Sequence, residues 1–224
     1  MTQGAILFAF NSPKYDYYAM AEYTAQRINH FLNLPVTLVT DEVSLASSTG
    51  YVFDKVVTVE PDKNNKFQKE IWINKGRYQA YELSPYDETL LLDVDYMVNS
   101  DKLLNCFKFY DDFCCHDTTA YLMYPNAEQE MLSAYSFKTL WATALAFKKT
   151  PRVQQIFQCL KMVQKNFDHY ANIHQFLSST FRNDYALTLA LRIVNGHTAQ
   201  AQDFIPWNLL HVGKDTSVYA NSTD

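Results

Sequence analysis

Hydrophobic positions in the N-terminal part of the chain follow a strand, helix, strand order. Residues 4–10 form a continuous apolar run that ends at Asn11, which predicts a buried strand followed by a loop. Over residues 16–32 the apolar side chains recur at spacings of three and four, so we expect an amphipathic helix, which Pro35 would end. The β-branched run over residues 36–40 predicts a second strand, which a right-handed crossover would make parallel to the first.

A further apolar run, residues 88–98, carries two carboxylates, those of Asp93 and Asp95. It predicts a buried strand of a parallel sheet, on which alternate side chains share one face, so the two aspartates should point the same way. Two adjacent anions are costly to desolvate without a cation, and their oxygens suit Mg²⁺ or Mn²⁺ that also holds a diphosphate. The alternative is that one aspartate caps the next turn while the other is solvated.

A short basic segment precedes this strand. The pattern predicts a helix over residues 74–83 with Lys75 and Arg77 at its start. Both cations could reach a phosphate at the carboxyl edge of the sheet, where Asn11 and Asp41 are also expected and where open α/β sheets bind their ligands. The alternative is that Lys75 and Arg77 are simply solvated.

The second half of the chain begins with two predicted strands, over residues 113–116 and 143–147, joined by an irregular aromatic loop over residues 121–135. A periodic helix is then expected from Pro151 to Phe167.

Another helix should follow Asn183 as its N-cap, with Asp184 in the first turn. The helix macrodipole favours an acid at this position, so Asp184 needs no further role. Because no linker appears, we predict one α/β domain over residues 1–211, with a mostly parallel central sheet flanked by helices, and a polar tail over residues 212–224. Residues 1–100 would bind a nucleotide and residues 101–211 an acceptor.

Composition narrows the functional classes. The 224 residues are 48% hydrophobic, enough for one well-buried domain. The net charge of -5 and the pI of 5.6 argue against a surface that grips nucleic acid over many phosphates. Four cysteines without a C-x-x-C pair indicate neither a zinc knuckle nor a disulfide framework. No apolar stretch approaches the roughly 20 residues of a membrane span, so we expect a soluble, cytoplasmic protein without membrane contact.

Taken in order, these elements resemble nucleotide-sugar-dependent glycosyltransferases of the GT-A fold, a Rossmann-type architecture. The most specific stretches are residues 8–11, 39–41, 86–98 and 181–187, and the whole is similar to short glycosyltransferase-like proteins of tailed phages. The resemblance implies that the D-x-D of Asp93 and Asp95 holds the divalent metal, Mn²⁺ or Mg²⁺, and that Asp93 also contacts the donor. A phage protein would act in the host cytoplasm.

The same resemblance assigns further residues. Phe10, Asn11 and Asp41 would touch the nucleoside. His211-Val212-Gly213-Lys214 is similar to a shortened form of H-x-x-G-x-x-K-P-W in retaining members, in which the His completes the metal shell and the Lys binds the diphosphate.

Asp184 would face the acceptor, as its base or as an orienting group. The alternative for His211 is a histidine bonded to backbone. One departure from the family is Leu140-Trp141-Ala142, which stands where many members have a turn with glycine.

These features predict a metal-dependent transfer of a hexose or pentose from a nucleotide sugar, with UDP-sugars favoured, to an acceptor hydroxyl. A modified base of phage DNA is one candidate acceptor, although the acidic pI argues against it. A D-x-D phosphatase, a sugar nucleotidyltransferase and a non-catalytic nucleotide-sugar or glycan-binding protein are the alternatives. The sequence leaves the oligomeric state open.

Overall fold

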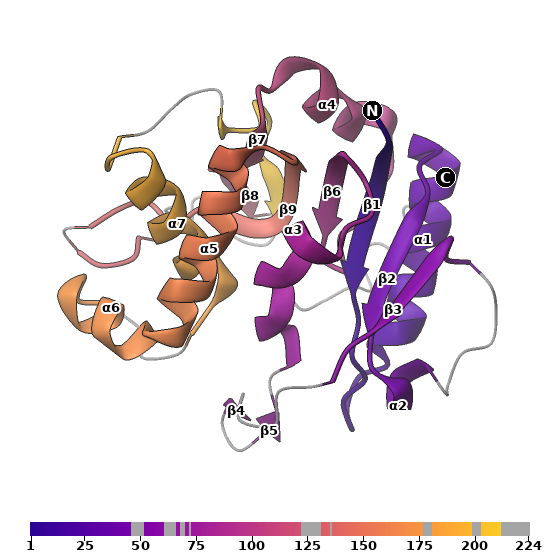
Figure 1. Ribbon diagram of the computed structural model, residues 1–224, viewed down its shortest axis with the longest axis horizontal. Coiled ribbons are helices and arrows are strands. Elements are labelled where there is room, and N and C mark those ends of the chain that lie inside the picture. Colours follow the sequence, from indigo (N-terminus) through magenta and orange to yellow (C-terminus); the bar gives the residue numbers. More distant parts are fainter. Residues whose placement is uncertain are drawn as a thin grey trace.

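The centre of the molecule is a six-stranded sheet (Figure 1). The computed structural model describes residues 1–45, 52–60, 66–67, 70–71, 73–121, 131–134, 136–176, 181–198 and 203–211. The sheet order is β3 (Lys55–Thr58), β2 (Val36–Thr40), β1 (Gln3–Phe8), β6 (Glu88–Leu92), β9 (Trp141–Lys148) and β7 (Phe113–His116). Only β9 runs in the direction opposite to the other five strands of this sheet, so the predicted mostly parallel α/β class is confirmed.

The central strands are buried along nearly their whole length because helices cover both faces of the sheet. Every residue of β2 and β6 is buried, as is every residue of β1 after Gln3. Burial on both faces removes the usual alternation of polar and apolar residues. The continuous runs in the sequence therefore predicted these strands correctly.

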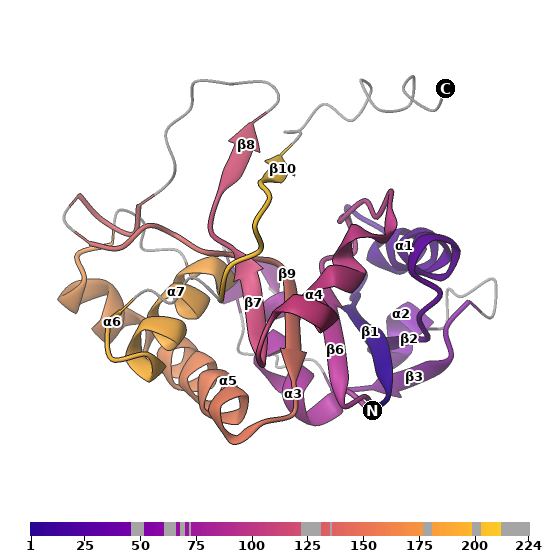
Figure 2. The ribbon, with the colours of Figure 1, turned by 90° about the horizontal axis from the view of Figure 1, so that it is seen from above.

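Two helical layers enclose the sheet (Figure 2). The helices α1 (Tyr17–Leu32) and α4 (Asn105–Phe109) pack on one face. The other face is covered by α3 (Ala80–Leu83), α5 (Pro151–Lys165), α6 (Phe167–Ile173) and α7 (Asn183–Val194). The apolar stripe of each long helix is thus matched to one of two cores, as the helical spacing indicated.

Short elements connect or extend these layers. They are α2 (Glu42–Leu45), η1 (Ile73–Gln79), η2 (Asp101–Leu104), the pair β4 (Lys66–Phe67) and β5 (Glu70–Ile71), and the pair β8 (Thr119–Tyr121) and β10 (Leu209–His211). The parallel pair β8 and β10 extends away from the main sheet (Figure 2). Among the described helices, none has the length and apolar character needed to cross a membrane.

The predicted helix boundaries need three corrections. The segment before β6 is a 3-10 helix over η1 that becomes α-helical only in α3. The helix after Pro151 ends at Lys165, and Asn166 separates it from α6. Asn183 is the first residue of α7 and not its cap, because the capping position belongs to Arg182.

Two side-chain contacts fix the sheet and the α5–α7 layer. The Tyr86 ring lies over Gly4, where a Cβ atom would come within 2.4 Å of it, and the Tyr86 hydroxyl lies 2.9 Å from Thr37 Oγ1. On the other side, Arg152 at the start of α5 donates to the buried carboxylate of Asp203 at 2.8 and 2.9 Å. These contacts join segments that are distant in sequence.

The carboxyl end of β7 carries a buried histidine. His116 is fully buried, and its Nδ1 lies 3.1 Å from the carbonyl oxygen of Trp207. Burial lowers the pKa of His116, because the imidazolium form would lose its hydration. Burial therefore favours the neutral form of the ring.

Candidate functional site

The aspartate motif lies on a turn and not on a strand. β6 ends at Leu92, and the Tyr96 amide donates to the carbonyl oxygen of Asp93 at 3.0 Å, which closes the turn. The predicted strand over residues 88–98, with Asp93 and Asp95 sharing a strand face, is therefore wrong beyond Leu92. The turn still places both carboxylates at the carboxyl end of a central parallel strand, where ligands of open α/β sheets bind.

The two aspartates differ in their surroundings. The Asp95 side chain is exposed, whereas that of Asp93 is 28% exposed and forms an ion pair with Arg77 Nη1. Arg77 reaches this position from η1, and its side chain is only 6% exposed. Arg77 is therefore buried and paired beside the aspartate turn, so the alternative of a solvated cation is wrong for this residue, and its predicted contact with a phosphate stays a prediction.

The second guanidinium nitrogen of Arg77 is in an unusual position. Nη2 is buried and has no hydrogen-bond partner in the described part of the chain. Lys75 also belongs to η1, but its side chain is not among those described. Arg77 is thus the cation that the structure places beside the aspartate turn, with one donor still to be satisfied.

Asn11 and Asp41 hold the neighbouring strand ends. Asn11 Oδ1 accepts a hydrogen bond of 2.8 Å from the backbone N–H of Tyr18 in the first turn of α1. The backbone N–H of Asn11 donates to Ser44 Oγ at 2.7 Å. Asp41 is buried, and its Oδ1 accepts from the Ser44 amide at 2.7 Å. Both side chains therefore act as local caps that shape the edge of the sheet. Their predicted contact with a nucleoside stays a prediction.

Phe10 is buried within the core on the α5–α7 side of the sheet. It lies two residues beyond the end of β1, and the intervening Ala9 amide still donates to the carbonyl oxygen of Val39 at 3.0 Å. The predicted role of Phe10 in donor binding also stays a prediction.

Asp184 lies in the first turn of α7 and bonds to two groups. Its Oδ1 accepts from the Ala142 amide at 2.8 Å, and its Oδ2 accepts from Arg182 Nη2 at 2.9 Å. The first bond ties the start of α7 to the start of β9. The Arg182 guanidinium in turn lies 5.8 Å from the centre of the Trp141 ring, within range of a cation–π contact.

The C-terminal candidates are only partly described. His211 is the last residue of β10 and pairs in register with Tyr121 of β8, but its side chain is outside the described set. Lys214 lies outside the described residues altogether. Within the part of the chain that the structure describes, no three His, Cys, Asp or Glu residues form a group that could hold a metal ion.

The aspartate turn nevertheless suits a divalent cation in its chemistry. Asp93 and Asp95 supply carboxylate oxygens, the ligands that Mg²⁺ and Mn²⁺ prefer, and both side chains are reachable from solvent. Mg²⁺ in particular is commonly held by one or two carboxylates, with substrate phosphates and water as its other ligands. The residues present therefore fit such an ion.

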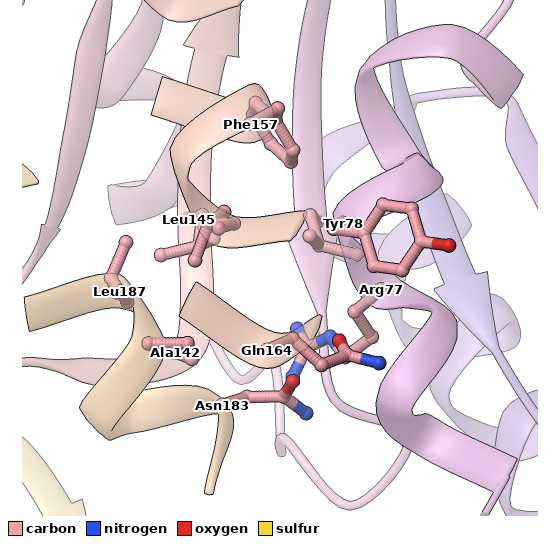
Figure 3. Close-up of a pocket in the computed structure, with 11 residues that line it drawn as sticks. Arg77, Tyr78, Ala142, Leu145, Phe157, Gln164, Asn183 and Leu187 are labelled. Carbon is pink, nitrogen blue, oxygen red and sulfur yellow. The ribbon is translucent and has the colours of Figure 1, made fainter. Parts of the chain in front are cut away.

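A pocket opens beside the Arg77–Asp93 pair (Figure 3). The polar ends of Arg77, Gln164 and Asn183 gather at one end of it. The other lining residues are Tyr78, Leu91, Ala142, Leu145, Phe157, Leu160, Ala186 and Leu187. The free volume, about 20 Å³, is room for roughly one water molecule.

The sequence patterns did not predict this pocket. Gln164 lies on α5 outside any motif, and Asn183, which lies within the stretch 181–187, was predicted only as a helix cap. Only the packing of α5 and α7 against η1 brings these side chains to Arg77.

Comparison with known proteins identifies the fold. No protein-family model matches the chain, and no curated protein sequence matches it. The structure is similar to a galactosyltransferase, LgtC, in complex with donor and acceptor sugar analogs, at 14% identity and a TM-score of 0.54, over 84% of this chain and 70% of that one.

Two other structures give the same result. An active-site mutant of LgtC has 13% identity and a TM-score of 0.54, over 94% of this chain and 88% of that one. The apo form of mouse xyloside xylosyltransferase 1 has 10% identity and a TM-score of 0.51, over 95% and 85%. Together with the mostly parallel six-stranded sheet, these likenesses show that the chain has the GT-A glycosyltransferase fold.

Proposed function

We propose that the protein is a metal-dependent glycosyltransferase that moves a sugar from a nucleotide diphosphate sugar, with UDP-sugars favoured, to an acceptor hydroxyl. The observation that carries this proposal is the turn of Asp93 and Asp95 at the carboxyl end of β6, with Arg77 beside it. The GT-A fold supports it, since the structures that share this fold include a galactosyltransferase with donor and acceptor sugar analogs bound.

Asp93 and Asp95 would hold Mn²⁺ or Mg²⁺, and His211 is our candidate for a third ligand. The bound ion would supply Lewis-acid stabilisation of the leaving diphosphate. Arg77 would fix the orientation of Asp93 through their ion pair. Lys214, and Lys75 if its side chain reaches the edge, would add positive charge near the diphosphate.

Asp184 has two possible roles in this reaction. In an inverting transfer it would accept the proton of the acceptor hydroxyl, and in a retaining transfer it would orient the sugar or the acceptor. Both of its oxygens already accept hydrogen bonds, from Ala142 and Arg182. Each carboxylate oxygen has two lone pairs, so these contacts position Asp184 and are compatible with either role.

The two halves of the chain would divide the work. Residues 1–100 contribute β1, β2, β6 and the aspartate turn, and we assign donor binding to this half, with Phe10, Asn11 and Asp41 near the nucleoside. Residues 101–211 would form the acceptor side. A hydroxymethylated DNA base is one candidate acceptor if the protein is phage-encoded, and a cytoplasmic location would follow.

Titration calorimetry with UDP, in the presence and absence of Mn²⁺, tests the proposal. We expect Mn²⁺-dependent binding of UDP that Asp95→Asn abolishes, because this substitution removes one charge from an exposed side chain and changes little volume. UDP affinity that is the same with and without Mn²⁺, or the same in Asp95→Asn, would contradict the metal site.

Product analysis separates the alternatives. Incubation with UDP-sugars and Mn²⁺ should release UDP as the sugar passes to an acceptor hydroxyl or to water, whereas a binding protein would release no UDP. A phosphatase would instead release inorganic phosphate from a phosphomonoester substrate tested separately. A sugar nucleotidyltransferase would instead form a nucleotide sugar from a nucleoside triphosphate and a sugar phosphate. Transfer of labelled sugar to hydroxymethylated DNA, compared with unmodified DNA, tests the candidate acceptor.

A further inference from the structure

The pocket beside the Arg77–Asp93 pair combines two kinds of surface. Arg77 lines it and carries the buried Nη2 that has no partner in the described part of the chain. A buried donor without an acceptor is costly, so an oxygen atom of a ligand at this place would be strongly favoured.

The neighbouring side chains add the complementary polar groups. Gln164 and Asn183 place their amide ends near Arg77 (Figure 3), and a side-chain amide offers both an acceptor oxygen and donor hydrogens. The walls next to these amides are apolar, with Ala142 and Leu187 among them. The free volume of about 20 Å³ takes a methyl group alone, so the polar atoms of a larger ligand would lie outside this recess, at the end where Arg77 and the two amides gather.

We propose that this pocket binds the acetamido group of an N-acetylhexosamine carried by the nucleotide donor. The acetamido carbonyl oxygen accepts from Arg77 Nη2, the amide N–H donates to the side-chain oxygen of Gln164, and the methyl group fills the apolar recess. This inference rests on the proposed function, because it names the sugar class for the same site.

The charges argue against a carboxylate in this place. Arg77 is already paired with Asp93, and the nearby Asp184 is paired with Arg182, so the four formal charges cancel. A uronic acid carboxylate would add an anion with no cation of its own. A bare hydroxyl would satisfy Arg77 Nη2 and leave the apolar recess unfilled. The acetamido group both accepts the hydrogen bond of Arg77 Nη2 and fills the apolar recess.

Binding of four donors to the full-length protein with Mn²⁺ tests the inference. The probes are UDP-N-acetylglucosamine, UDP-N-acetylgalactosamine, UDP-glucose and UDP-glucuronate, with UDP alone as the reference. We expect at least one N-acetylhexosamine donor to bind roughly tenfold more tightly than UDP-glucose, from one buried hydrogen bond and one buried methyl group.

Two substitutions locate the preference in the pocket. Ala142→Val fills the recess with two further methyl groups, and Arg77→Lys keeps a cation for Asp93 but removes the second guanidinium nitrogen. Each should reduce the tenfold preference to about twofold. Ala144→Val is the matched control for the first, because Ala144 is a buried residue of the same strand whose side chain belongs to the core on the α1 side of the sheet. It should leave the preference unchanged.

The outcomes separate this inference from the proposed function. If UDP itself fails to bind with Mn²⁺, the proposed function fails. If UDP binds but UDP-glucose or UDP-glucuronate binds as tightly as both N-acetylhexosamine donors, only the acetamido inference is overturned. The same holds if Ala142→Val and Arg77→Lys fold and retain the full preference.

Discussion

The ion pair between Arg77 and Asp93 predicts that the two aspartates of the turn contribute differently to stability. Arg77 is 6% exposed and Asp93 28%, so Asp93→Asn leaves a buried guanidinium without its counter-charge. Loss of one partner from a fully buried pair costs about 3–5 kcal/mol. Partial exposure and the oxygen that asparagine keeps reduce this value, so we expect Asp93→Asn to lower the free energy of unfolding by about 2 kcal/mol. The same substitution at the exposed Asp95 should lower the free energy of unfolding by less than about 0.5 kcal/mol.

Substitution of the other partner, Arg77, should destabilise the protein less. Arg77→Met leaves a carboxylate that is more than a quarter exposed and can be hydrated, while the methionine fills much of the arginine's space. We therefore expect Arg77→Met to cost about 1 kcal/mol or less, and Asp93→Asn to cost little more in that background. The difference between the cost of Asp93→Asn in the wild-type protein and its cost in the Arg77→Met background measures the coupling energy of the pair.

Urea unfolding in the presence of EDTA is the appropriate assay, because chelation removes any contribution of metal binding to the stability of the folded state. Asp93→Asn should also lower the melting temperature by about 4–8 °C, given about 2–4 °C for each kcal/mol in a protein of this size. Equal effects of Asp93→Asn and Asp95→Asn, or additive effects of Asp93→Asn and Arg77→Met, would refute the argument that Arg77 depends on Asp93.

Three further predictions concern other parts of the fold. Gly4→Ala places a Cβ atom 2.4 Å from the Tyr86 ring and should lower the free energy of unfolding by about 1–3 kcal/mol, whereas Gly76→Ala, whose Cβ would lie 4.0 Å from its nearest neighbour, should be neutral or slightly stabilising in urea titrations. Because burial lowers the pKa of His116, the unfolded chain binds a proton more readily than the folded protein, so stability should fall as the pH drops below about 6.5, and His116→Asn should reduce that pH dependence. Burial raises the pKa of Cys114 well above its ordinary value, so this thiol should resist a thiol reagent at pH 8 in the folded protein and react once urea unfolds it.

The sheet was predictable from sequence because its central strands are buried on both faces. The runs at residues 4–10 and 36–40 fall within two residues of β1 and β2. The same signal misplaced the end of β6, since Val94 and Val98 are buried although they lie beyond the strand. Apolar character reports burial and not backbone conformation.

Val94 and Val98 are buried for a reason that no local pattern reveals. Thr24 Oγ1 and Arg27 Nε of α1 donate to the carbonyl oxygens of Val94 and Val98, each at 2.5 Å. The helix thus satisfies backbone groups that a strand would have paired with a neighbour. Because these partners are about seventy residues apart, the turn at Asp93 could not be told from a longer strand.

Asp184 and Asp93 are connected through adjacent residues of β9, and this connection bears on how Asp184 acts. The Ala142 amide donates to Asp184 Oδ1, and the next residue, Thr143, accepts from the Asp93 amide at 2.8 Å. The start of β9 therefore fixes the first turn of α7 relative to the aspartate turn. Loss of the Asp184 carboxylate would free the Ala142 amide and loosen the turn that carries the metal ligands we propose. A lower rate in an Asp184 variant would accordingly reflect lost positioning as much as a lost base, so only the anomeric configuration of the product can separate the two roles.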